Sequence, residues 1–188
     1  MSEQTEQVES IEQLVASRLR DIPDFPEPGV SFKDFTPLLS DGGALRAVVR
    51  DIATRRAGSI DLVVGIEARG FIFGAAMAHQ MGAGFVPIRK PGKLPHESIG
   101  HDYELEYGTN RVEMHVDGIA KGERVVVVDD LLATGGTALA ALALVEKSGA
   151  SIVECAFVIE LSDLPGRKRI EERGTRVHAL CTFTEAER

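Results

Sequence analysis

Two adjacent carboxylates, Asp129 and Asp130, follow the four valines Val125–Val128 and precede the small, glycine-rich turn Ala133–Thr137. The valine run predicts a buried strand, and the turn leads into a helical pattern. Backbone N–H groups, threonine hydroxyls and a helix N-terminus together suit a phosphate. The aspartates, expected to face outward where the strand ends, suit vicinal sugar hydroxyls. The pattern predicts a phosphorylated-sugar site; the alternative is an ordinary turn in which the aspartates cap the helix.

Other phosphate-binding motifs fit this turn poorly. A P-loop ends in Gly-Lys-Ser/Thr, but here Gly136 precedes Thr137 without a lysine. The Gly-x-Gly-x-x-Gly fingerprint of dinucleotide sites is also absent from the sequence.

Two more segments place cations after predicted strands. Gly65–Phe71 contains Arg69, whose guanidinium can bind a diphosphate through paired hydrogen bonds. The alternative there is a surface salt bridge between Glu67 and Arg69. The second segment, Arg89–Pro95, holds the cations Arg89, Lys90 and Lys93. A solvated loop is the usual explanation of such a cluster, but its place after a strand favours neutralisation of an anionic leaving group.

Hydrophobic periodicity predicts alternating helices and strands. The expected helices are Val8–Arg20, a helix capped by Asp41 that runs to about Arg56, Gly70 to about Gln80, and Thr137–Ser148 with Gly149 as its C-cap. The expected strands are Ile60–Ile66, Phe85–Arg89, Arg124–Val128, Ile152–Glu160 and Val177–Phe183. Proline-rich Ile22–Gly29 is expected to be a loop or extended segment, and Lys90–His101, which contains glycines and prolines, a mobile loop. Tyr103–Glu106 and Arg111–Val116 are expected to form the arms of a hairpin around Gly108.

This alternation predicts an α/β fold with a mostly parallel, twisted sheet flanked by helices on both faces. Ligands of such sheets bind beyond the carboxyl ends of the strands. The chemically interesting residues follow Val64, Ile88 and Val128. We therefore expect three strand ends to converge on one site.

The overall composition limits the possible partners and location. The chain has 188 residues and a net charge of -8, which argues against a broad nucleic-acid-binding face. It contains no apolar run of transmembrane length, so no membrane partner is expected. The polar N-terminus is unlike a secretory signal, and two isolated cysteines, Cys155 and Cys181, indicate buried thiols in a reducing cytoplasm. The five histidines show no zinc-like spacing, and no metal ligands are assigned.

The run Val125–Thr137 resembles the signature of the type I phosphoribosyltransferases, which bind phosphoribosyl pyrophosphate. Its form Asp-Asp-Leu-Leu-Ala-Thr-Gly-Gly-Thr is similar to that of the adenine-specific members of this family. The resemblance extends from Pro23–Pro26 to Cys155, with five segments matching in the expected order. It implies the family's fold: one domain over 1–188, with an N-terminal helix and base-binding hood over 1–40 and a flexible lid and β-hairpin over 90–116.

The resemblance implies a distribution of roles over the site. The 5′-phosphate and ribose would be bound by Asp129, Asp130, Ala133, Thr134, Gly135, Gly136 and Thr137. The pyrophosphate would be bound by Glu67, Ala68, Arg69, Arg89, Lys90 and Lys93, and the Glu67–Ala68 bond is expected to be a non-proline cis peptide.

The base-binding residues are implied in the same way. Phe32 would stack on adenine, and backbone groups of Ser31 and Lys33 would read its edge. An incorrect base would leave buried polar groups unpaired. Family members often have arginine where this chain has Lys33, which puts any guanidinium contact in doubt. Glu106 matches the glutamate placed near the purine imidazole for proton transfer; the alternative is a solvent-facing residue of a hairpin arm.

The implied reaction joins adenine to phosphoribosyl pyrophosphate and gives AMP and diphosphate, with Mg²⁺ bound largely through the substrate. The resemblance also implies a homodimer. One rival is a regulatory protein that only senses phosphoribosyl pyrophosphate, although the acidic chain has no basic helix-turn-helix segment before residue 30. Another is the same chemistry on hypoxanthine or xanthine.

Overall fold

The central sheet consists of five parallel strands in the order β4-β3-β7-β8-β9. The computed structural model describes residues 9–25, 27–29, 31–56, 58–104 and 109–184. The strands are β3 (Leu62–Ile66), β4 (Gly84–Ile88), β7 (Arg124–Leu132), β8 (Ser151–Leu161) and β9 (Val177–Phe183). The predicted, mostly parallel α/β sheet is confirmed.

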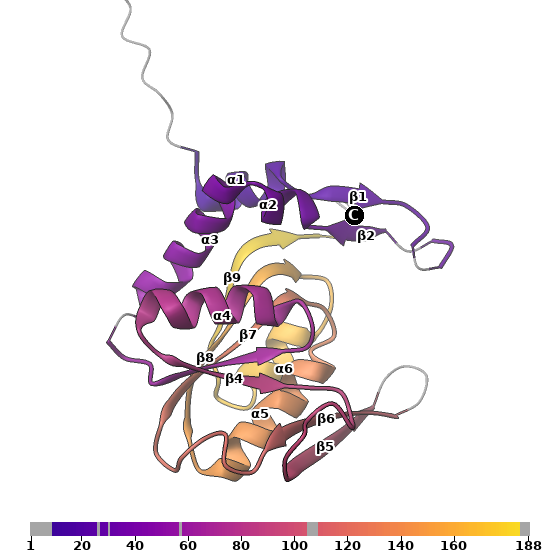
Figure 1. The fold of residues 1–188 in the computed structure, drawn as a ribbon. Coiled ribbons are helices and arrows are strands. Elements are labelled where there is room, and N and C mark those ends of the chain that lie inside the picture. Colours follow the sequence, from indigo (N-terminus) through magenta and orange to yellow (C-terminus); the bar gives the residue numbers. More distant parts are fainter. Residues whose placement is uncertain (1–8, 26, 30, 57, 105–108, 185–188) are drawn as a thin grey trace, which may run out of the picture.

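Successive valine side chains of β7 point to opposite faces of the sheet, as the pleat of a β-strand requires. Val126 and Val128 pack on the face that carries α3 (Gly42–Arg55) and α4 (Gly70–Met81). Val125 and Val127 pack on the opposite face, which carries α5 (Gly136–Ser148). Figure 1 shows the sheet between these helix layers.

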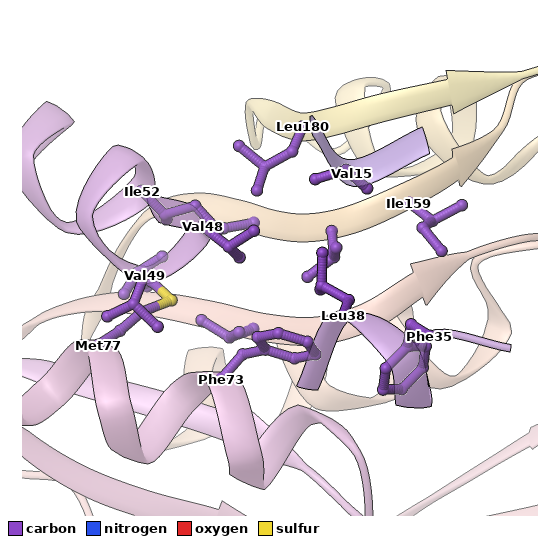
Figure 2. Packing of buried hydrophobic residues seen from close by; sticks show 14 of the residues in the cluster. Val15, Phe35, Leu38, Val48, Val49, Ile52, Phe73, Met77, Ile159 and Leu180 are labelled. Atoms are coloured by element: carbon purple, nitrogen blue, oxygen red, sulfur yellow. The ribbon is translucent and has the colours of Figure 1, made fainter. Parts of the chain in front are cut away.

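The core on the first face joins both of its long helices. Figure 2 shows Val48 and Ile52 of α3 beside Phe73 and Met77 of α4, all buried. Asp41 caps α3 as predicted, accepting hydrogen bonds from the N–H groups of Gly43 and Ala44. Gly149 ends α5 in the left-handed conformation, also as predicted. No helix among the described residues has the length and apolarity needed to span a membrane.

Strand β7 is longer than its valine run indicates. We predicted an end at Val128, but the strand continues to Leu132. The cause is β8, which has 11 residues and pairs with β7 as far as Leu132, opposite Glu160. The two aspartates therefore lie within the last part of the strand rather than beyond it.

The N-terminal part forms a small layer over the carboxyl end of the sheet. Helix α1 (Ile11–Ser17) is shorter than predicted, because Arg20 already belongs to strand β1 (Arg20–Ile22), which pairs antiparallel with β2 (Phe32–Asp34). Ile22 is the last residue of β1, which agrees with the loop or extended segment expected over Ile22–Gly29, whereas short helix α2 (Thr36–Ser40) was not predicted. Figure 1 shows this hood near the end of β9.

An antiparallel hairpin packs against α5 and β4, away from the hood. Its arms are β5 (Ser98–Glu104) and β6 (Thr109–His115). The predicted hairpin is confirmed, but the expected loop over Lys90–His101 is too long, since Ser98 already pairs with His115. A further short helix, α6 (Gly166–Glu171), follows β8 and was not predicted. Figure 1 shows the hairpin below the sheet, beside α5.

Candidate active site

The glycine-rich turn forms a small cradle between the end of β7 and the start of α5. A cavity of about 100 Å³ is lined by this turn, Asp129 and Phe157. Gly135 adopts φ +80°, a left-handed conformation that favours glycine, and α5 begins at the next residue. The N-terminus of α5 therefore stands directly behind the cradle, where unpaired N–H groups attract an anion. The predicted residues Ala133, Thr134, Gly135, Gly136 and Thr137 all line it.

The hairpin reaches this cradle through Tyr103. The hydroxyl of Thr137 donates a hydrogen bond to the phenolic oxygen of Tyr103 at 3.1 Å. Lys147 of α5 also donates to the carbonyl of Gly100 at 3.3 Å. These contacts attach β5 to the helix that begins at the cradle. Sequence reasoning missed Tyr103, although its place three residues before Glu106 was a signal.

Asp130 is buried rather than facing outward, which corrects our expectation. Its side chain is 5% exposed, and its Oδ2 lies 2.9 Å from Nε of Arg69. This is an ion-pair distance, but Oδ2 accepts no hydrogen bond among the described residues. A buried carboxylate oxygen without a hydrogen-bond donor is unusual in a folded protein, so this atom needs an explanation.

Asp129 is half-buried and interacts closely with its neighbour. Its Oδ1 accepts a hydrogen bond from the N–H of Asp130 at 2.9 Å. Burial, together with the negative charge of Asp130, raises the pKa of Asp129 well above its usual value. Opposite this carboxylate, a Cβ on Gly70 would meet Val128 O at 2.7 Å, so glycine lets α4 approach the strand end.

The loops after β3 and β4 are tied together by an ion pair. Nη2 of Arg89 donates to Oε1 of Glu67 at 2.9 Å, and the N–H of Lys90 donates to Oε2 at 2.9 Å. Hydrogen bonding by Arg89, followed by that from Lys90, lowers the pKa of Glu67 despite partial burial. The alternative salt bridge between Glu67 and Arg69 is therefore wrong.

The remaining residues of these loops lie where the sequence predicted. The Glu67–Ala68 peptide bond is cis, as the resemblance implied. Arg89 Nη1 also donates to the carbonyl of Lys93 at 2.9 Å, so the cationic segment folds back on its own strand end. The side chains of Lys90 and Lys93 are exposed.

The hood contacts the same loops through aromatic rings. The guanidinium carbon of Arg69 lies 5.4 Å from the ring centroid of Phe32 and 5.3 Å from that of Phe35. Arg69 therefore connects Asp130 with the hood. Ser31 and Phe32 are half-buried next to this contact.

Lys33 uses its side chain within the hood. Its ammonium lies 2.7 Å from Oδ1 of Asp21 and 4.4 Å from the ring centroid of Phe183. The side chain is 6% exposed. The Lys33 side chain therefore packs inside the protein, between strand β1 and the end of β9.

The three predicted strand ends do converge. In the parallel register, Gly65 lies opposite Pro87 on one side and Val128 on the other. Glu106 lies outside the described residues; the register brings its neighbours Glu104 and Thr109 together at the end of the hairpin. A wider cavity of about 560 Å³ beside α6 is lined by both acidic and basic side chains, among them the Glu160–Arg167 ion pair.

Comparisons with known proteins agree with this geometry. Residues 38–179 match the family model described as a phosphoribosyl transferase domain. An adenine phosphoribosyltransferase of Nitrosospira multiformis is 54% identical over 90% of this chain and 97% of its own length.

Solved structures are similar over the same range. The adenine phosphoribosyltransferase of Thermoanaerobacter pseudethanolicus has a TM-score of 0.87 and 46% identity, covering 93% of this chain and 100% of that one. The enzyme of Saccharomyces cerevisiae, solved with an imino-altritol bisphosphate and adenine, has a TM-score of 0.85 and 38% identity, covering 90% of this chain and 98% of that one.

Proposed function

This chain belongs to the phosphoribosyl transferase domain family, among its adenine phosphoribosyltransferases, and we propose how its residues divide the work of that reaction. The enzyme joins adenine to phosphoribosyl pyrophosphate, releasing AMP and diphosphate, and so salvages adenine. A bond forms between an imidazole nitrogen of adenine and the anomeric carbon of ribose, while the bond from that carbon to diphosphate breaks. Adenine is the nucleophile, so the chemistry requires no covalent enzyme intermediate.

The observation that carries the assignment of the ribose site is the buried Oδ2 of Asp130, which has no hydrogen-bond donor among the described residues. It lies in the strand end that leads into the phosphate cradle. A ribose hydroxyl would supply the missing donor when the 5′-phosphate is bound by Ala133–Thr137. Two adjacent carboxyl groups can then hold the vicinal diol, and the charge of Asp130 favours the cationic sugar of the transition state. Binding energy at the phosphate orients the anomeric carbon.

The cationic loops would bind the leaving diphosphate. Arg69 and Arg89 now pair with Asp130 and Glu67, and both guanidinium groups are within reach of an anion beyond the strand ends. Lys90 and Lys93 add exposed charge, and the backbone at Ala68 follows the cis bond. Together these groups stabilise the negative charge that develops on the departing oxygen.

Mg²⁺ would bind mainly through the substrate. Among the described residues, no group of three or more histidine, cysteine or acidic side chains is arranged to hold a metal. Mg²⁺ typically takes one or two carboxylates together with phosphate oxygens and water, which fits the aspartate pair beside a diphosphate. The ion would supply charge neutralisation to the diphosphate.

The hood would bind adenine, with Phe32 against the purine face and the backbone of Ser31 and Lys33 at its edge. The contact between Phe32 and Arg69 supports this placement, because it puts the ring next to the diphosphate loops. Glu106 would accept the imidazole proton as the new bond forms. Closure of the lid over 90–116 would bring Glu106 to the base and exclude water.

We also propose a homodimer in the cytoplasm. The dimer is what the resemblance to this family implies, and a partner packed on α4 would cover Ile72, which is 43% exposed. Cys155 and Cys181 are buried thiols outside any disulfide, which suits a reducing compartment. Light scattering after size-exclusion chromatography tests the dimer.

A direct assay separates this function from its rivals. The purified protein is incubated with Mg²⁺, phosphoribosyl pyrophosphate and each base separately, and the nucleotide is measured by chromatography. AMP from adenine, with little product from hypoxanthine or xanthine, is expected. Absence of AMP with retained binding of phosphoribosyl pyrophosphate would favour a sensor instead.

The role of Glu106 has its own test. Glu106→Gln should lower kcat by about 100-fold, typical of a lost general base, while KM for phosphoribosyl pyrophosphate stays near that of the unmodified enzyme. Glu97→Gln removes an exposed carboxylate of the same lid and serves as the control. An unchanged kcat in Glu106→Gln would remove this residue from the mechanism.

A further inference from the structure

Helix α6 lies against the phosphate cradle and satisfies two of its carbonyl groups. The N–H of Gly166 donates to the carbonyl of Ala133 at 3.1 Å. Nη1 of Arg169 donates to the carbonyl of Thr134 at 2.7 Å, across 35 residues of sequence. Both acceptors belong to the turn proposed to hold the 5′-phosphate.

Because the peptide bond is planar, these two hydrogen bonds also orient the N–H groups inside the cradle. In a trans peptide the C=O and the following N–H point in opposite directions. A carbonyl of Ala133 held toward α6 therefore turns the N–H of Thr134 away from α6. In the same way, the carbonyl of Thr134 held by Arg169 turns the N–H of Gly135 away from α6.

We propose that Arg169 is a positioning residue for the 5′-phosphate, acting with Gly166 to hold the Thr134 and Gly135 N–H groups toward the ligand. This inference rests on the proposed role of Ala133–Thr137 as the phosphate cradle. Arg169 does not contact the phosphate itself; it fixes the peptide planes whose N–H groups do. Donors that are already oriented bind an anion without first losing conformational freedom.

Helix α6 is itself anchored well enough to act as a support. A Cβ on Gly166 would meet the carbonyl oxygen of Ala133 at 2.2 Å, so the two backbones are in close contact. Ile170, on the same helix, is fully buried. Arg167 donates through Nε to Oε1 of Glu160 at 2.8 Å, and that carboxylate is 4% exposed. The helix is therefore held to β8 independently of Arg169.

The test compares two neighbouring charge-removing substitutions, Arg169→Met and Lys168→Met. Lys168 is 79% exposed and lies 3.9 Å from Glu172, away from the cradle, so both variants lose one positive charge on the same helix. Ribose 5-phosphate and pyrophosphate are titrated separately by calorimetry. Loss of one hydrogen bond predicts ribose 5-phosphate binding weaker by about three- to tenfold in Arg169→Met, with pyrophosphate affinity unchanged. Lys168→Met should bind both ligands like the unmodified enzyme.

Kinetics provide a second readout that general destabilisation would not reproduce. In Arg169→Met, KM for phosphoribosyl pyrophosphate should rise with kcat nearly constant, and Arg169→Lys, which keeps a charged donor, should lie nearer the unmodified enzyme. Equal weakening in Lys168→Met would overturn the proposal in favour of long-range charge, and unchanged ribose 5-phosphate binding in Arg169→Met would overturn it directly. If Thr137→Val binds ribose 5-phosphate as well as the unmodified enzyme does, the proposed cradle fails instead.

Discussion

The two ends of this site that we propose to bind anions are built from different parts of the chain. The phosphate cradle uses backbone groups, and its shape is set by Gly135, by the start of α5 and by α6 behind it. The diphosphate end uses long side chains, and its two arginines already have acidic partners, Asp130 and Glu67.

Because of this difference, the cradle is preorganised for an anion, whereas the arginines of the diphosphate end must exchange a carboxylate partner for the ligand. The cradle can accept a phosphate with little rearrangement, since its N–H groups belong to a fixed turn. The diphosphate must compete with carboxylates for the guanidinium groups, so part of its binding energy is used to break ion pairs. With the proposed roles, the cradle would anchor the substrate, and the cationic loops would rearrange in response to it.

The largest expected effect comes from a side chain added to the cradle. Gly135→Ala places a Cβ on a residue at φ +80°, where it would meet Cα of Gly166 at 2.9 Å. Left-handed strain together with overpacking should weaken ribose 5-phosphate binding by roughly 30-fold or more. Calorimetric titration of the purified variant measures this.

Gly92→Ala is the matched control in the cationic loop. Gly92 has φ +71°, but a Cβ there would meet nothing within 4 Å. The variant carries similar backbone strain without the clash, and we expect a change in ribose 5-phosphate affinity below about twofold, because strain in this loop does not reach the cradle. Comparable losses in the two variants would mean that the cradle is no more rigid than the loop.

Local patterns predicted most of the elements and the place of the glycine-rich turn between β7 and α5. The four valines alternate between the two faces of the sheet, which is why a continuous apolar run indicated a strand buried on both sides. Capping by Asp41 and Gly149 depends on neighbouring residues only, so the sequence was sufficient there. Convergence of the strand ends followed from parallel pairing.

The features that sequence reasoning missed depend on distant partners. The end of β7 is set by the length of β8, and the partner of Arg89 is set by the register of β3 with β4. Burial of Asp130 depends on Arg69, 61 positions earlier by residue number (130 minus 69). The support from α6 requires a helix of only six residues to lie behind the cradle, and no periodic pattern marks so short a helix.

A smaller effect is expected for Asp130→Asn, which should weaken ribose 5-phosphate binding without weakening pyrophosphate binding. The substitution removes the charge of the proposed ribose acceptor and the ionic partner of Arg69. Because asparagine keeps an acceptor oxygen but loses the charge, ribose 5-phosphate binding should weaken by roughly 10-fold. Pyrophosphate should bind as tightly as before or more tightly, because Arg69 no longer has a competing carboxylate.

Parallel titrations with the two ligands check this, with Asp102→Asn as the control. Asp102 pairs with Arg111 on the exposed side of the hairpin, outside the site. Equal weakening of both ligands by Asp130→Asn would contradict independent ends, since it would indicate general distortion of the site.

The smallest effect concerns the pH dependence of stability at the diphosphate end. Arg89 and the Lys90 N–H lower the pKa of Glu67 below its ordinary value of 4.5 in the folded protein. Such a group adds stability above its unfolded pKa, and this contribution disappears as the pH falls through the folded pKa. Glu67→Gln should therefore be less stable than the unmodified enzyme near neutral pH, and the difference should shrink as the pH is lowered from about 5 through the acid range.

Urea unfolding at a series of pH values measures this difference. A gap between the two proteins that stays constant with pH would show that Glu67 contributes by packing rather than by charge. Added pyrophosphate sharpens the result: by drawing Arg89 away, the ligand should return the pKa of Glu67 toward its ordinary value, and binding should take up a proton in mildly acidic buffer. Ribose 5-phosphate should leave the Glu67–Arg89 pair intact and cause no such uptake at this residue. Proton uptake is therefore compared between the unmodified enzyme and Glu67→Gln with each ligand. A difference seen only with pyrophosphate assigns the partner exchange to the diphosphate end.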